Sequence, residues 1–152
     1  MKTYILHLLG ASLAIIALSG CTNDSKKVTL REFEFNDSGL KVITSYVNEK
    51  AGTMSILYGN EAALNYSIKG NGEHVTGEVF KQVTFKQQAH EFWYGSRING
   101  ALQQVETINT VLQGANVIPV YAIQHYGPNT AKAEDRSARI KFILSQQASV
   151  FP

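Results

Sequence analysis

The chain has 152 residues, of which 44% are hydrophobic and 17% charged, a composition typical of one globular domain rather than of a disordered chain. Its formal net charge is only +2 and it has no run of basic residues, which argues against a nucleic-acid-binding protein. The only cysteine, Cys21, has no partner for a disulfide within the chain.

The first 20 residues have the three parts of a secretory signal. Lys2 supplies the positive charge, a hydrophobic run extends from Tyr4 to Leu18, and the small residues Ser19 and Gly20 precede Cys21. A membrane-spanning helix needs about 20 apolar residues, more than this run contains. The segment is therefore interpreted as a cleaved leader.

The four residues Leu18-Ser19-Gly20-Cys21 resemble the lipobox of bacterial lipoproteins. The resemblance implies cleavage before Cys21, acylation of its thiol, for example with palmitate, and a stable membrane anchor, because several acyl chains together bind a bilayer firmly. Residues 21–27 would then be the lipidated cysteine and a tether. Thr22 stands where aspartate marks retention in the inner membrane, so the outer membrane, facing the periplasm, is expected. The alternative is a secreted protein with an isolated cysteine.

Two strands joined by a tight turn are predicted at the start of the domain. Lys41–Asn48 is rich in β-branched and aromatic residues, and Thr53–Tyr58 has the same character. Only residues 49–52 separate them, which predicts an antiparallel hairpin. Ahead of them, Val28–Phe35 is interpreted as an edge strand or an ordered lead-in.

A short helix is predicted to follow over Asn60–Lys69. Asn60 is a good N-cap, Glu61 suits the positive end of the helix dipole, and Gly70 is a natural stop.

The stretch Gly77–Gly100 is expected to be the centre of the domain. It opens with a strand whose alternating side chains form two faces: Val79, Val83 and Phe85, and opposite them Gln82, Thr84 and Lys86. Lys81 and Phe80 break this alternation, so both faces of the strand are expected to be partly covered. An aromatic run, Phe92 to Tyr94, comes next, and then a loop between Gly95 and Gly100.

Two more strands and a helix complete the predicted domain. Residues 102–112 fit either a helix or a strand, and their content of Ile, Thr and Val favours a strand. Asn116–Tyr126 is the last strand, where Pro119 indicates an edge position or a bulge. A closing helix is predicted from a Thr130 cap, with an apolar stripe formed by Ile140, Ile143, Leu144 and Ala148. Residues 28–152 thus form a single α+β domain, an antiparallel sheet of about five strands with two or three packed helices.

Few residues indicate a catalytic or metal-binding role, and no catalytic residue is assigned. The carboxylates Glu78, Glu91 and Glu106 are isolated in sequence and are expected at the surface rather than in an acid–base pair. Three histidines and a methionine are candidate ligands of a metal or a non-covalent haem, although solvated or hydrogen-bonded histidines are the more ordinary interpretation: His74, His90, His125 and Met54. No metal site is predicted from their spacing.

The best candidate for a ligand pocket surrounds the aromatic run. Its predicted members are Phe85, Trp93, Tyr94, Arg97 and Asn99. Trp93 and Tyr94 would line the pocket or fill the core, and Arg97 beside Asn99 would contact an anionic or polar ligand or else hold the loop by bonding backbone carbonyls.

Four segments resemble the cytochrome P-460 family and its haem-free relatives: TMSILYGNEAA, GEVFKQVTFKQ, FWYGSRING and ARIKFILSQQASVFP. The resemblance covers about residues 41–152 and implies a small antiparallel sheet packed by helices, often in a homodimer. Haem-bearing members attach haem through CxxCH and cross-link it to a lysine on the central strand. This chain has no CxxCH, and Gln82 stands near that lysine position, so covalent haem is excluded. The scaffold and its pocket are what the resemblance implies, with large side chains such as Trp93, Tyr94 and Phe85 filling the space that haem would leave.

Three functions follow from these patterns. The first is an envelope lipoprotein, more a binding module than an enzyme, that holds an unknown small ligand or a partner. The second is a purely structural lipoprotein that dimerises or contacts other envelope components. The third is an oxidoreductase with a non-covalent haem or a metal.

Overall fold

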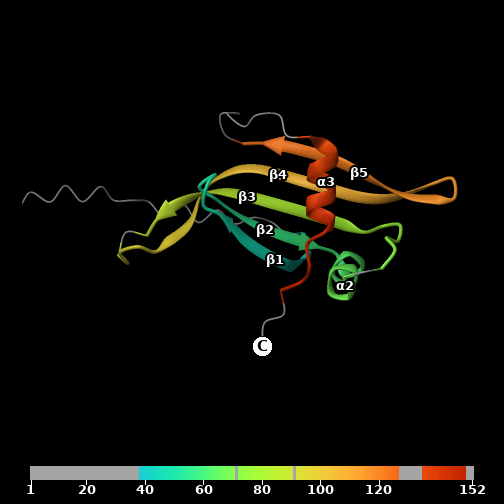
Figure 1. Cartoon of the computed structure of the whole chain (residues 1–152), viewed down its shortest axis with the longest axis horizontal. Helices are drawn as coiled ribbons and strands as arrows, with labels where there is room; N and C mark the ends of the chain where they lie inside the picture. Colours follow the sequence, from blue (N-terminus) through green and yellow to red (C-terminus); the bar gives the residue numbers. More distant parts are fainter. Residues whose placement is uncertain (1–37, 71, 91, 127–134, 150–152) are drawn as a thin grey trace, which may run out of the picture. The chain divides into compact units, whose positions relative to one another are not determined.

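The strands of this chain follow one another across a single sheet, and helices are added on one of its faces (Figure 1). The computed structural model describes residues 38–70, 72–90, 92–126 and 135–149, all within the unit Phe33–Pro152. Its elements are β1 (Lys41–Asn48), β2 (Thr53–Gly59), α2 (Glu61–Lys69), β3 (Val79–Ala89), β4 (Arg97–Gln113), β5 (Asn116–His125) and α3 (Arg136–Leu144).

Each strand pairs with the next one in the sequence, and every pairing is antiparallel. The sheet order is therefore β1-β2-β3-β4-β5. This confirms the α+β class, the sheet of five strands and the hairpin of β1 and β2. Residues 102–112 are a strand, as their β-branched side chains predict. β5 lies at the edge of the sheet, which explains how it accommodates Pro119.

The prediction of a loop between Gly95 and Gly100 is wrong, because β4 already begins at Arg97. Arg97 pairs with Ala89 and Asn99 with Gln87. Gly95 provides the turn, with a φ of 79°. Gly100 instead allows close approach of the strands, since a Cβ there would lie 2.9 Å from the carbonyl oxygen of Lys86.

Helix α2 forms as the local sequence predicts. The Asn60 side chain accepts a hydrogen bond from the backbone of Ala63, and Gly70 ends the helix in the left-handed conformation. Asn60 also accepts from the backbone of Val79 and donates to that of Gly77. The cap therefore joins α2 to the start of β3.

Helix α3 begins later than predicted. Asp135, not Thr130, is its N-cap and accepts a hydrogen bond from the backbone of Ser137; Thr130 lies outside the described residues, as does Val28–Phe35. Ala148 follows the helix rather than forming part of it, and its backbone donates to Ser67 of α2. The chain end thereby ties α3 to α2.

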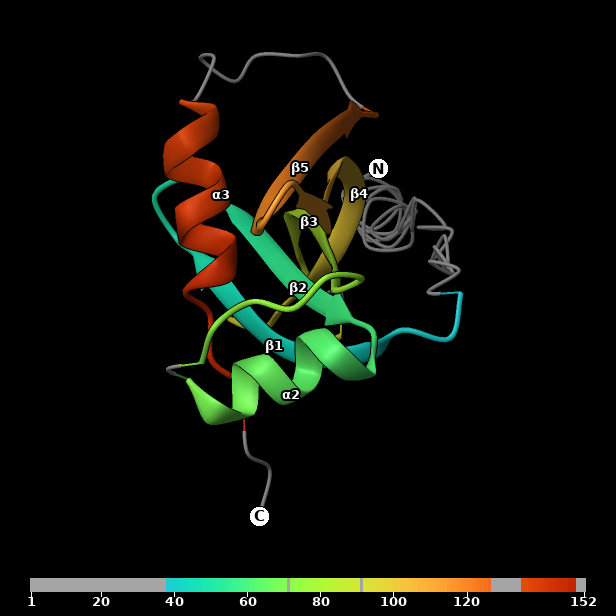
Figure 2. The same cartoon turned by 90° about the vertical axis from the view of Figure 1, so that its right-hand side faces the viewer.

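Both faces of the sheet carry buried apolar side chains, as the broken alternation of β3 predicts. The cluster under the helices contains Ile43, Leu57, Ala63, Phe80, Ile108 and Ile143. Figure 2 shows α3 alongside this face and α2 following the end of β2. The cluster on the opposite face contains Val83, Phe85, Leu102 and Val105. Phe80 and Val83 of β3 belong to different clusters, because they lie an odd number of residues apart and successive side chains of a strand point to opposite faces.

Gly59→Ala is expected to destabilise the domain by about 1–3 kcal/mol through overpacking. The new Cβ would lie 2.6 Å from Cδ1 of Ile43 and 2.9 Å from Cβ of Ala63, where β2 meets α2. Gly72→Ala is the matched control, since its Cβ meets no heavy atom within 4 Å. Urea denaturation measures both, and equal midpoints for the two variants would contradict the packing described here.

Candidate functional site

A carboxylate lies at the centre of the sheet face that α3 covers. Glu106 of β4 pairs with Gln82 of β3 and Ile123 of β5, and its side chain is 0% exposed. A buried carboxylate is costly unless its charge and its lone pairs are matched. Its position in the register therefore requires a nearby cation and several donors.

Five hydrogen bonds meet that requirement. Oε1 of Glu106 accepts from Nε of Arg139 at 2.9 Å and from the hydroxyl of Tyr121 at 2.8 Å. Oε2 accepts from Nη2 of Arg139 at 2.6 Å and from the amides of Gln82 and Gln104, each at 3.1 Å. We call these residues, Glu106, Arg139, Tyr121, Gln82 and Gln104, the Glu106 centre. Its two-pronged arginine contact joins α3 to the middle of the sheet.

Tyr46 of β1 extends the polar region beside this centre. Its ring packs edge-on against Phe142 of α3, whose ring also lies 5.2 Å from the guanidinium of Arg139. Burial raises the pKa of Tyr46 above its ordinary value, and the negative charge of Glu106 adds to this rise. Hydrogen bonds from Ser55 and Arg139, and the arginine charge, act in the opposite direction. The neutral hydroxyl is therefore the form that the fold favours.

A second buried carboxylate lies near α2. Oε2 of Glu78 is 2.7 Å from Nδ1 of His74, and Oε1 accepts from the backbone of Val75 at 3.2 Å. The His74 ring stacks on Tyr66 of α2 at 3.9 Å. His74 is thus held by its neighbours, as the ordinary interpretation of the histidines predicts. The expectation that Glu78 and Glu106 are surface carboxylates is wrong, because the tertiary structure supplies each with partners; Glu91 lies outside the described residues.

The sequence reasoning missed the Glu106 centre, although one signal was available. Arg139 lies four residues before Ile143, so the two share the helix face that packs on the sheet. A cation on an apolar helix face needs a buried anion opposite it. The identity of that anion depends on strand register, which the sequence does not display.

The structure does not bring all members of the predicted ligand pocket together. Phe85 is buried on the sheet face opposite the helices, whereas Trp93 and Tyr94 lie at the turn between β3 and β4. There Phe92 is 78% exposed, Trp93 70% and Tyr94 fully. We call these three residues the aromatic tip. The predictions that Trp93 and Tyr94 fill the core or the space that haem would leave are wrong, because both side chains are exposed and no described element lies over the turn.

The polar members of the predicted pocket belong to the same hairpin. The guanidinium of Arg97 donates to Oε1 of Gln87 at 2.7 Å, so it links the two strands of the ribbon rather than a loop. Asn99 stands opposite Gln87. Arg97 remains exposed beside the tip and is the member of the predicted pocket best placed to meet a ligand together with the aromatic residues.

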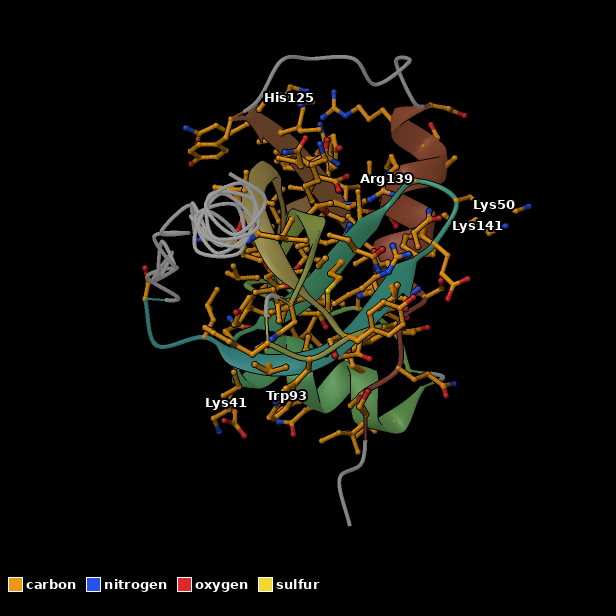
Figure 3. The ribbon with its side chains drawn as sticks, turned by 90° about the vertical axis from the view of Figure 1, so that its left-hand side faces the viewer. Lys41, Lys50, Trp93, His125, Arg139 and Lys141 are labelled. Carbon is orange, nitrogen blue, oxygen red and sulfur yellow. The ribbon has the colours of Figure 1, made fainter. Side chains whose placement is uncertain are left out.

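The candidate haem and metal ligands are not brought together. His74 precedes β3 and His90 follows it, and the 11 residues of that strand span roughly 35 Å. His125 lies at the end of β5, and Figure 3 shows it well separated from Trp93; the ring of His90 stacks on that of Trp93. Met54 of β2 stands between Val47 and Phe85. Within the described residues no three His, Cys, Asp or Glu side chains gather as a metal-binding group.

Comparisons with known proteins add no family to these observations. No family model matches this chain, and no curated protein matches it either. The resemblance to the cytochrome P-460 family therefore stays a prediction. None of the helices in the described residues has the length and the apolar character needed to span a membrane.

Arg139→Met is expected to lower the free energy of unfolding by about 3–5 kcal/mol, because Glu106 would stay buried without its cation. Arg136→Met is the matched control: Arg136 is exposed and bonds a backbone carbonyl, so about 1 kcal/mol or less is expected. Adding Glu106→Gln to Arg139→Met should recover part of the loss, since no charge would remain. Urea denaturation tests all three, and equal losses for the two single variants would contradict a structural role for the ion pair.

Tyr46 is expected to make the stability depend on pH in the alkaline range. Its folded pKa is raised above the unfolded value, so its contribution is complete below about pH 10 and is lost as the pH rises through the folded pKa. Tyr46→Phe should remove this loss, whereas Tyr94→Phe at the exposed tip should keep it. Urea denaturation midpoints measured from neutral to alkaline pH test this expectation. If the midpoints of the wild type and of Tyr46→Phe fall in parallel as the pH rises, Tyr46 is not the group responsible.

Proposed function

We propose that this protein is a lipid-anchored protein of the bacterial cell envelope, and that its domain is a binding module rather than an enzyme. The observation that carries the proposal is the aromatic tip, where three successive aromatic side chains keep 70% or more of their surface exposed. The leader and Cys21 support the anchor by their sequence alone, since they lie outside the described residues. The anchor is proposed to hold the domain at the outer membrane, facing the periplasm.

The exposure of the tip favours a role in contact. Single exposed apolar residues are ordinary, but a contiguous group marks an interaction site. Tryptophan and tyrosine are enriched among the residues that dominate binding energy. The Trp93 ring also stacks on that of His90, with the ring centroids 5.3 Å apart, and this contact favours one position of the ring before binding. Such preorganisation lowers the entropic cost of association.

The contacts of the buried carboxylates indicate a structural role. Both oxygens of Glu106 accept hydrogen bonds, and Arg139 balances its charge. Both oxygens of Glu78 are likewise engaged by His74 and the backbone of Val75. A general base needs a lone pair within reach of a substrate proton. These contacts instead hold the helices and the loop before β3 in place.

We also propose that the fold is that of the cytochrome P-460 family without covalent haem. The order of strands and helices and the quoted sequence segments support this. The haem-filling role expected for Trp93 and Tyr94 is not part of the proposal, because both are exposed.

A structural, dimeric lipoprotein is the second candidate, and one observation favours it. β5 is an edge strand, and its Val120 and Ile123 are 44% and 42% exposed. An exposed edge with apolar side chains can pair with a second copy of the chain. The oxidoreductase with non-covalent haem or metal gains no support from the positions of the histidines.

Cross-linking in cells tests the binding module. The full chain is expressed with a photoreactive phenylalanine analogue in place of Tyr94, or in place of Tyr126 as a matched control that is also exposed. Adducts are expected from position 94 and not from position 126. Metabolic labelling with palmitate tests the anchor in the same cells, with Cys21→Ser as the unlabelled control.

The two parts of the proposal fail separately. Equal or absent adducts at positions 94 and 126 would refute the tip as the contact surface. Label that persists in Cys21→Ser, or a wild-type chain without label, would refute the lipid anchor.

A further inference from the structure

We propose that the aromatic tip inserts into the interfacial region of a lipid bilayer, so that Phe92, Trp93 and Tyr94 form a second contact with the membrane. This inference rests on the proposed function, in which the tip is the contact surface of an anchored protein. It adds that the partner is lipid.

The composition of the tip suits the zone between headgroups and acyl chains. Trp93 and Tyr94 each combine an apolar ring with one polar group, and within the described residues neither polar group has a hydrogen-bond partner in the protein. At a membrane interface such rings are buried while the indole N–H and the phenol O–H stay hydrated. Phe92 adds an apolar side chain without a polar group. A dry protein pocket would have to satisfy those polar groups by itself.

Part of the backbone of the tip is bonded within the protein, which lowers the cost of placing the tip in an apolar medium. His90 donates its backbone N–H to the carbonyl of Ser96 at 2.9 Å, and Ser96 donates to that of Trp93 at 3.1 Å. The backbone of Phe92 donates to Nδ1 of His90 at 3.1 Å. Unpaired backbone groups are costly in an apolar medium, and these bonds reduce that cost.

The tip lies beyond the part of the sheet in which β3 and β4 have neighbouring strands. β2 pairs with β3 only up to Lys86, and β5 pairs with β4 only from Gln104. Residues 87–89 and 97–99 therefore form a two-stranded ribbon beyond both neighbouring strands, at the left of Figure 1. Three residue pairs span about 10 Å, which matches the depth to which interfacial segments are buried, about 5–10 Å.

The charges behind the tip fit the headgroup level. Arg97 lies exposed on the ribbon and is held by Gln87, and Lys86 is exposed where the ribbon begins. Such cations favour lipid phosphates. The sequence also has a carboxylate next to the tip, Glu91. We therefore expect burial of the aromatic rings, more than charge, to drive insertion.

The full-length lipidated protein tests this inference, because Trp93 is its only tryptophan and reports on the tip alone. The protein is reconstituted into phosphatidylethanolamine–phosphatidylglycerol vesicles with and without a brominated phosphatidylcholine. If the tip inserts, the fluorescence emission of Trp93 shifts to shorter wavelength in vesicles and is quenched by the brominated lipid. Acrylamide in the aqueous phase then quenches Trp93 less in the presence of vesicles than in detergent-free buffer without them.

Matched variants separate the tip from the other exposed apolar surface. Phe92→Ser with Tyr94→Ser should reduce quenching by the brominated lipid, while Val120→Ser with Ile123→Ser on β5 should leave it unchanged. In the Cys21→Ser protein, which has no acyl anchor, the same tip pair should weaken vesicle binding about tenfold or more. The wild-type measurement decides the question even if a variant does not fold.

Three outcomes would overturn the inference. In the first, the protein sediments with vesicles while Trp93 remains open to acrylamide and unaffected by brominated lipid, which leaves the anchor intact but the tip in water. In the second, Trp93 is protected from both quenchers, which indicates a protein partner or a second copy; the proposed binding module would survive this result. In the third, the tip variants and the β5 variants lose lipid quenching equally.

Discussion

The buried pair of Glu106 and Arg139 is the constraint on which the rest of the domain depends. α3 has nine residues, too few to be stable as an isolated helix in water. Two of its side chains hold it in place: Ile143 packs in the apolar cluster, and the guanidinium of Arg139 bonds Glu106 at the centre of the sheet. Because breaking such a pair leaves a charge without a partner, the pair allows few alternative positions of the helix. The chain end after α3 then reaches α2 and β1 through backbone bonds to Ser67 and Ile43.

Structural and proposed functional features occupy different parts of the same two strands. The middle of β3 and β4 carries Gln82 and Glu106: Gln82 donates to Glu106, and Glu106 binds Arg139 of α3. The far end of the same hairpin carries the aromatic tip, beyond the pairing of β2 and β5. The long β4 joins these regions, since its 17 residues extend from the tip past the Glu106 centre. A rigid core can therefore hold an exposed contact surface at a defined position.

This arrangement bears on the resemblance to the cytochrome P-460 family. The resemblance implies a pocket near the aromatic run, and the loss of haem implies that large side chains fill it. The structure instead places Phe85 in the core of the opposite face and Trp93 and Tyr94 in solvent. The aromatic residues of the FWYGSRING segment are thus available for contact outside the domain. The scaffold and the use of this segment are separate questions, as is usual when one fold supports different sites.

Local features were determined by the sequence itself. The hairpin turn, the Asn60 cap and the Gly70 stop are set by neighbouring residues, and β1 and α2 have the predicted bounds or nearly so. The exposed aromatic tip and the buried state of Glu78 and Glu106 were decided only by the tertiary structure. Each of these depends on which residues face one another across strands or between sheet and helix. Strand register and packing set those contacts between residues far apart in the chain. The periodicity of apolar residues in the sequence indicates that a side chain faces inward, but it does not indicate which partner that side chain meets.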